Sequence, residues 1–332
     1  MALTRTRALA VGILALALFA ALAASVAIGS VTLPLRAVFA ALAHPHGGGD
    51  ATAIVWALRL PRVLIAALVG GALAASGTLL QGMLRNGLAD PSLTGGSAGA
   101  AFAIAVAIAL GAPAPLYAAI AFAAALATTV AVATLARRGT GISRERLILA
   151  GIAVSSLFAG LTTLIIQLVP SASVTLSILA WLGGSLVGHG WRDLSWAALY
   201  ALAGIVVACT AVPALNAIRL GDARARALGV DLERTRWIVL AASSLLTAAA
   251  VSVSGVIGFV GLIVPHVVRA LCGSDARWAL PASIPAGAVV VVLTDTIARS
   301  AAPPLELPIG VLLSLLGVPA FLYIAFRRER LA

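Results

Sequence analysis

The chain has 332 residues, of which 62% are hydrophobic and only 10% are charged. Soluble domains are about half apolar and about a quarter charged, so a water-soluble core could not bury this much apolar surface. A disordered chain needs low hydrophobicity, and a disulfide scaffold needs more than the two cysteines present, so both classes are excluded. The chain is therefore predicted to be a membrane protein.

The net charge of +11 would also suit a nucleic-acid-binding protein. Here, however, the 22 basic residues punctuate long neutral stretches, as topology signals do, and no nucleic-acid partner is predicted. All 22 are arginine. Because the P-loop motif GxxxxGK[ST] requires a lysine, the chain is predicted not to be a P-loop ATPase. ATP-driven transport would need a separate cytoplasmic ATPase subunit, which would bind the ATP and Mg²⁺.

Ten apolar segments have roughly the 20 residues that a helix needs to cross a bilayer core of about 30 Å. In chain order they are 8–29, 63–84, 93–110, 115–136, 147–169, 194–215, 237–253, 256–271, 280–298 and 309–326. The first follows Arg5 and Arg7, as in a signal peptide, but its length favours a retained helix. Segment 171–188 is interrupted by glycine and is predicted to be a short re-entrant or interfacial helix.

The distribution of arginines predicts the orientation of these spans. If the N-terminus is cytoplasmic, seventeen arginines fall on the inner side and five on the outer side. Cytoplasmic loops carry the excess of basic residues, so this orientation is favoured over its inverse. Both termini are then cytoplasmic, and the outer arginines are Arg36, Arg59, Arg62, Arg192 and Arg299.

Two halves of the chain share a weak internal similarity. Arg59 precedes Ser76 and Gly77 by 17 residues, and Arg236 precedes Ser254 and Gly255 by 18. Transporters are often built from inverted repeats, so we expect a single permease domain over 1–332 with repeats of about 1–170 and 190–332. Small residues such as those at 70–72, 74–77 and 95–97 are predicted to pack helices closely.

One polar loop, about 216–236, has the signals of a short capped helix. Asp222 is a suitable N-cap and Gly229 a suitable C-cap, which predicts a helix over 222–228. A linker would not need caps. The loop is therefore interpreted as a docking surface for another protein, displaying Ala225, Leu228 and Val230.

Few residues could carry chemistry, so no catalytic residue, metal site or cofactor is predicted. Asp295 is the one acid inside a predicted span, and an ion pair with Arg299 is favoured over a proton-relay role. His44 and His46 have no further metal ligands evident near them. A proton-coupled secondary transporter, which would need titratable groups at mid-membrane, is the disfavoured alternative.

Five strings in the sequence resemble the FecCD permease family, the membrane subunits of type II ABC importers. They are RLPR at 59–62, LQGMLRNGLADP at 80–91, RARALGV at 224–230, GFVGLIVPH at 258–266 and ELPIG at 306–310. One departure is Gly87, where the family usually has proline. The resemblance implies an all-α fold of ten transmembrane helices, like the vitamin B12 importer permease. It also implies a homodimer in the bacterial inner membrane with two ATPase subunits and a periplasmic binding protein.

The resemblance also implies roles for individual residues. The residues implied to dock the binding protein are Arg59, Arg62 and Arg299. Those implied to couple to the ATPase are Gly221, Asp222, Ala225, Leu228, Gly229 and Val230. Those implied to form the cytoplasmic gate are Asn86, Leu88, Ser143 and Arg144.

A weakly polar translocation path is predicted from the fifth-span region. The residues proposed to line it are Ser155, Ser156, Thr162 and Thr163. Arg192 is either a contact for a substrate carboxylate or an anchor at the membrane interface beside Trp191. The overall resemblance is nearest to haem importers, which predicts haem as the substrate. Ferric siderophores and cobalamin remain alternatives because the motifs are shared across the family.

Overall fold

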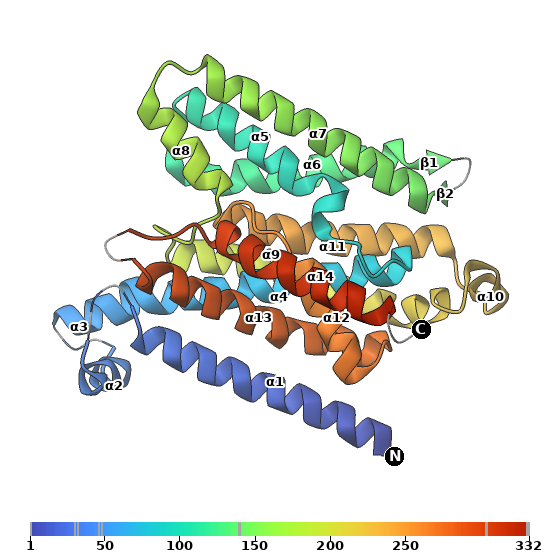
Figure 1. The fold of residues 1–332 in the computed structure, drawn as a ribbon, viewed down its shortest axis with the longest axis horizontal. Helices are drawn as coiled ribbons and strands as arrows, with labels where there is room; N and C mark the ends of the chain where they lie inside the picture. The colour runs from blue at the N-terminus through green and yellow to red at the C-terminus, as the bar shows by residue number, and fades with distance from the viewer. Residues whose placement is uncertain are drawn as a thin grey trace.

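A computed structural model describes residues 2–29, 31, 33–45, 47, 49–138, 141–302 and 305–329. The described chain is almost entirely helical, and its long helices run roughly along one axis (Figure 1). These long helices are α1 (Ala2–Ala27), α4 (Leu60–Leu84), α6 (Tyr117–Leu135), α7 (Arg144–Leu168), α9 (Trp191–Ile218), α11 (Leu232–Ser254), α13 (Ala276–Ser300) and α14 (Ile309–Glu329).

Shorter elements connect the long helices. The α-helices among them are α2 (Leu35–Ala43), α3 (Asp50–Ala53), α5 (Gly96–Ala109), α8 (Ala172–Leu182), α10 (Asp222–Ala227) and α12 (Val260–Cys272). A π-helical segment η1 (Ile54–Arg59) and two 3₁₀ turns, η2 (Pro91–Thr94) and η3 (Ala114–Leu116), complete the helical elements. Strands β1 (Arg137–Arg138) and β2 (Gly141–Ile142) pair antiparallel, with Arg137 opposite Ile142.

Each of the ten predicted spans coincides with a helix, although their lengths differ. Seven of the described helices are long and apolar enough to cross a membrane. The predicted spans at 93–110, 256–271 and 309–326 correspond to the shorter apolar segments Gly96–Ala109, Val260–Cys272 and Ile309–Leu322. The protein is thus a multi-span helical membrane protein, and the count of ten spans stays a prediction. The helix predicted within 171–188 is present as α8.

Local sequence explains where several helices begin. Ser143, Asp231 and Asp275 precede α7, α11 and α13, and each side chain accepts a hydrogen bond from a backbone N–H in the first turn. Such caps satisfy N–H groups that have no partner inside the helix. The span predicted to start at residue 63 starts earlier, because helix is continuous from Asp50 to Leu84. Arg59 and Arg62 therefore lie within a helix and not in a loop.

Helix α4 lies at the centre of the core, between α11, α12 and α13. Its backbone meets α13 where a Cβ added to Gly70 would lie 2.1 Å from the carbonyl oxygen of Gly287. It meets α12 where a Cβ on Gly77 would lie 2.0 Å from the carbonyl oxygen of Gly261. Only glycine permits these approaches, which confirms the predicted close packing through small residues.

The Ser-Gly pairs that suggested a repeat are not structurally equivalent. Ser76 and Gly77 lie in the middle of α4, whereas Gly255 ends α11 with φ +67°. A break follows, so α12 starts at Val260 and not at the predicted residue 256. The inverted repeat and its boundaries therefore remain a prediction without this support.

The two ends of the molecule differ in what they carry (Figure 1). The first turn of α1, the β hairpin, α10 and the last described turn of α14 lie at one end, here called the α10 end. Helices α2 and α3 lie at the opposite end, here called the α3 end. Helices α5 to α8 form a layer on one side of the central core, and α1 packs against α13 on the other.

Candidate functional site

A cavity of about 510 Å³ lies along α7, between this helix and residues of η2, α5 and α8. Hydroxyl and aliphatic side chains line it, and no charged residue occurs among the described residues that do so. All four hydroxyl residues predicted for the path contribute, namely Ser155, Ser156, Thr162 and Thr163. The structure thus brings these four residues together on one surface.

The polarity of this surface is weak because the threonine hydroxyls are already bonded within α7. Thr162 donates to the carbonyl oxygen of Phe158 at 2.7 Å, and Thr163 donates to that of Ala159 at 2.9 Å. A second cavity of about 790 Å³ shares Ser92 with the first and extends along α14. Together they form a mostly apolar concave surface.

Helix α7 is largely uncovered within the single chain. Only 11% of its apolar window is buried, against 83% for the window in the helix that includes α4. An apolar helix this exposed is covered by lipid or by another chain in a membrane. Arg192, predicted as a path residue, is exposed in the first turn of α9 and does not line either cavity. Its role as a substrate contact therefore stays a prediction.

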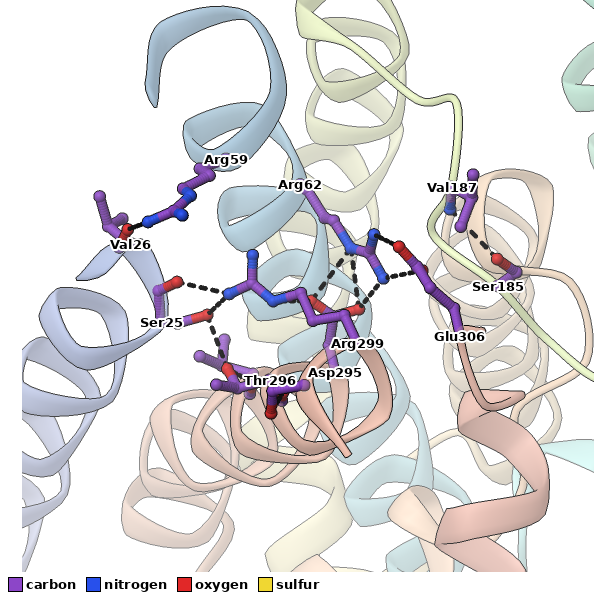
Figure 2. Close-up of polar contacts among 12 residues, drawn as sticks. Ser25, Val26, Arg59, Arg62, Ser185, Val187, Asp295, Thr296, Arg299 and Glu306 are labelled. Carbon is purple, nitrogen blue, oxygen red and sulfur yellow. Dashed lines mark hydrogen bonds and ion pairs between the residues drawn. The ribbon is translucent and has the colours of Figure 1, made fainter. Parts of the chain in front are cut away.

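At the α3 end, the three arginines predicted to dock a partner surround one cavity of about 400 Å³ (Figure 2). Arg59 is only 4% exposed and donates to the carbonyl oxygens of Val26 at 2.7 Å and Ala27 at 2.9 Å. These are among the last carbonyls of α1, which lack partners inside their own helix. Arg59 therefore satisfies the end of α1.

Arg62 is held by two carboxylates. Its Nη2 lies 2.8 Å from Oδ1 of Asp295, which is fully buried, and 2.8 Å from Oε2 of Glu306. Asp295 also faces Arg299, with 3.7 Å between Oδ2 and Nε. The predicted pair between Asp295 and Arg299 is therefore present, but Arg62 on a different helix is the closer partner.

Arg299 is also 4% exposed and donates to the backbone carbonyl and, at 2.7 Å, to the hydroxyl oxygen of Ser25 on α1. The three arginines thus join α1, α4 and α13 within the chain, as Figure 2 shows. They are not free side chains on an open surface, so docking through them stays a prediction. Any partner carboxylate would enter a cavity in which Arg62 already has Glu306 as a ligand.

At the α10 end, the short helix α10 is closed by a Schellman motif. The N–H of Val230 donates to the carbonyl of Ala225 at 3.0 Å, and that of Gly229 donates to Arg226 at 2.9 Å. Gly229 has φ +81°, which glycine adopts without strain. The prediction that Gly229 ends this helix is therefore confirmed. At the N-terminal end Gly221 is the cap and Asp222 the first helical residue, one position from the prediction.

The predicted docking face of α10 needs one correction. Ala225 is fully buried and packs with Ile218 and Leu232, and Val230 is partly buried against them. Burial of Ala225 and Val230 accompanies the Schellman motif, because this motif brings these two positions together. Leu228, which directly follows α10, is 65% exposed, so it offers a large apolar side chain at the surface.

Asp222 joins α10 to two long helices. Its Oδ1 accepts from Arg144 at the start of α7, and its Oδ2 accepts from Nη2 of Arg236 on α11 at 2.7 Å. Arg236 also donates to the carbonyl of Ile142 at 2.7 Å. A residue predicted to gate and a residue predicted to couple are thus direct partners. The sequence analysis missed Arg236, which lies 14 residues from Asp222 and carries no local signal of this contact.

The other predicted gate residues make local bonds. The side-chain oxygen of Asn86 accepts from the N–H of Leu88 at 2.9 Å, which forms the turn after α4 and leaves Leu88 56% exposed. Ser143 caps α7. The histidine pair at 44 and 46 cannot be compared with its prediction, because His46 lies outside the described residues.

Comparisons with known proteins identify relatives of the whole chain. Residues 16–327 match the FecCD transport family. The hemin transport system permease protein HmuU of Yersinia pestis is 38% identical over 287 residues, covering 84% of this chain and 85% of that protein. The cobalamin import system permease protein BtuC of Halobacterium salinarum is 38% identical over 301 residues, covering 90% of this chain and 80% of that one.

A solved structure shares the fold. It is a transporter described as of the metal-chelate ABC type, in an inward-facing conformation, with a TM-score of 0.86 and 31% sequence identity. The match covers 96% of this chain and 98% of the other.

Proposed function

The chain belongs to the FecCD transport family and is the permease of an ABC importer, and we propose that its substrate is haem. The observation that carries the proposal is the long cavity beside α7, which has hydroxyl and aliphatic lining residues and no charged one among those described. Haem is a flat, mostly apolar molecule, so this lining suits it better than it suits a polar ferric siderophore.

Sequence identity does not rank the substrates. The relatives named for hemin and for cobalamin are both 38% identical to this chain. The choice between haem, a ferric siderophore and cobalamin therefore depends on the chemistry of the cavity. The position of Arg192 outside both cavities gives no support for an arginine that binds the propionates of haem.

We propose that two copies of the chain pair across the exposed face of α7, with the path between them. The low burial of α7 supports this arrangement, because a second copy would cover an apolar helix and close the open side of the cavity. Orientation with the α10 end in the cytoplasm follows from the arginine distribution. The periplasmic binding protein would then dock at the α3 end.

In this arrangement, α10 would dock two ATPase subunits, one for each copy of the permease. Leu228 offers an exposed apolar contact, and Asp222 would pass movement of α10 to α7 through Arg144. At the α3 end, the cavity among Arg59, Arg62 and Arg299 would take a carboxylate of the binding protein. Such pairs fix register and steer encounter more than they add affinity.

The test is cargo uptake by the permease reconstituted in vesicles with its ATPase and binding protein. Haem, a ferric hydroxamate and cobalamin are offered separately, with and without ATP. We expect ATP-dependent uptake of haem. Uptake of cobalamin or the ferric hydroxamate in place of haem would overturn haem as the proposed substrate. Uptake that needs a proton gradient but no ATP would indicate a secondary transporter.

A substitution in the cavity separates transport from assembly. Ser155→Phe would fill part of the 510 Å³ cavity and should abolish haem uptake while leaving the complex assembled. The matched control is Thr210→Phe, since Thr210 is exposed on α9 away from the cavity. Equal uptake by both variants would exclude the cavity from the path.

A further inference from the structure

A second polar cavity, of about 330 Å³, lies at the α10 end between the ends of α4 and α9, α12 and the start of α13. Three arginines line it: Arg85 follows α4, Arg219 follows α9, and Arg269 lies on α12. His266 and Gln81 also line it. Among the described lining residues there is no aspartate or glutamate, so the cavity concentrates positive charge.

Hydrogen bonds inside the protein position two of these arginines. Arg269 donates to the side-chain oxygen of Gln81 on α4, and Arg219 donates to the carbonyl oxygen of Ser274. Arg85 has φ +52°, a left-handed conformation that residues other than glycine adopt infrequently. A backbone conformation of this kind costs free energy and recurs at ligand sites, where it directs a side chain.

One neighbouring acid, Asp275, offsets only part of the positive charge of the cavity. Asp275 accepts from the side chain of Asn216 at 2.7 Å and from the N–H of Arg277 at 3.0 Å. Burial opposes ionisation of Asp275, but these hydrogen bonds outweigh it and lower the pKa of the carboxyl. Asp275 is thus an ionised cap of α13, and its single negative charge leaves the three arginines in excess. A further arginine, Arg7, lies beside the cavity rim, with its Nη2 3.1 Å from where a Cβ on Gly273 would be.

The cavity lies at the depth where membrane spans end. Arg85 and Arg219 directly follow the apolar helices that end at Leu84 and Ile218, and Ala276, which also lines the cavity, starts another such helix. Phospholipid headgroups lie at this level of a bilayer, just outside the hydrocarbon core. The α10 end is also the side predicted to be cytoplasmic, and anionic lipids are enriched in the cytoplasmic leaflet.

We propose that this cavity binds the phosphate of an anionic phospholipid headgroup. Guanidinium groups match phosphate oxygens with paired donors, and three of them surround the space. The bound headgroup would link the ends of α4, α9 and α12. It would also lie close to α10, because Nη1 of Arg85 is 4.0 Å from where a Cβ on Gly221 would be. The lipid would thus stabilise the surface beside the coupling helix.

The test measures lipid binding to the purified chain by native mass spectrometry and by thermal unfolding. Phosphatidylglycerol is compared with phosphatidylcholine, and glycerol 3-phosphate serves as a soluble source of the same phosphate chemistry. We expect retained phosphatidylglycerol and a raised unfolding temperature with that lipid alone. Equal stabilisation by glycerol 3-phosphate would overturn the lipid as the source, and equal stabilisation by phosphatidylcholine would overturn the site.

Charge-removing variants locate the site. Arg85→Asn keeps a residue that tolerates the left-handed conformation, and Arg219→Gln changes an exposed side chain, so both should fold. Each should weaken phosphatidylglycerol binding about fivefold, and the pair about 25-fold. Arg146→Gln, an exposed arginine at the same end outside the cavity, is the matched control and should not weaken it. If the two cavity variants bind phosphatidylglycerol as tightly as the control and the parent protein do, the proposal fails.

Discussion

Asp222, the first residue of α10, is ion-paired with Arg144, the first residue of α7. Two helix starts that lie 78 residues apart in the chain are thereby joined. Arg236 on α11 holds the other oxygen of the same carboxylate. The surface proposed to meet the ATPase and the helix proposed to line the path thus share one carboxyl group.

We predict that Asp222→Asn reduces transport more than it reduces ATP hydrolysis. The amide keeps the shape of the side chain but removes the charge that both arginines share, so movement of α10 would no longer pull on α7. The measurement is haem uptake per ATP hydrolysed in reconstituted vesicles, and we expect a drop of roughly tenfold, as for the loss of one charge-assisted contact.

Glu233→Gln is the control for Asp222→Asn. Glu233 pairs with Arg137 at the same end, with 3.4 Å between Oε1 and Nη2. Both side chains are more than a third exposed, at 35% for Glu233 and 51% for Arg137. Exposed pairs of this kind contribute little, so uptake per ATP should stay unchanged. A similar drop in both variants would mean that charge at this end matters and the link between α10 and α7 does not.

We predict that Asp295→Asn strongly destabilises the fold. Asp295 is fully buried between Arg62 and Arg299, and its neutral amide would leave two largely buried guanidinium groups short of counter-charge. Removing one partner of a buried pair costs about 3–5 kcal/mol. The measurement is thermal unfolding in detergent or nanodiscs, and a variant as stable as the parent would show that the network contributes nothing to folding.

Glu306→Gln tests docking without this loss of stability. Glu306 is the more exposed partner of Arg62, at 29%, so its removal should cost at most about 1 kcal/mol. If a carboxylate of the binding protein enters this cavity, the variant frees one face of Arg62 for it. We expect several-fold tighter binding of the binding protein by surface plasmon resonance, less so at high salt. Unchanged or weaker binding would argue against docking at Arg62.

We predict that Gly70→Ala destabilises the packing of α4 on α13. The new methyl group would lie 2.1 Å from the carbonyl oxygen of Gly287, so the helices would have to separate. Overpacking costs about 1–3 kcal/mol or more, which thermal unfolding would detect. Gly12→Ala on α1 is the control, because its methyl group would meet nothing within 4 Å and alanine favours the helix.

The sequence predicted what depends on local pattern. Apolar segments of span length located the helices, and Gly229 predicted the end of α10, because the length of an apolar run and a left-handed cap are both visible in neighbouring residues. The hydroxyl residues of α7 were also predicted to share a surface. These features arise from a single helix, so one stretch of sequence contains the information.

Contacts between distant segments could not be predicted in the same way. The partners of Arg62 lie 233 and 244 residues away, and no spacing rule connects them. Arg59 and Arg62 were therefore interpreted as loop residues, and the helix that includes α4 was predicted to start too late, at residue 63. The burial of Ala225 was missed for a related reason, since the small core beneath α10 forms only when α9 and α11 approach it.

The glycine contacts of α4 restrict how the molecule can change shape. Where the backbones of α4, α12 and α13 touch, at Gly70 with Gly287 and at Gly77 with Gly261, no side chain remains that could rotate to admit sliding. These three helices therefore pack backbone to backbone, and separating them would open a gap that no side chain could fill. A transport cycle that keeps these contacts would move the layer of α5 to α8 relative to α4, α12 and α13.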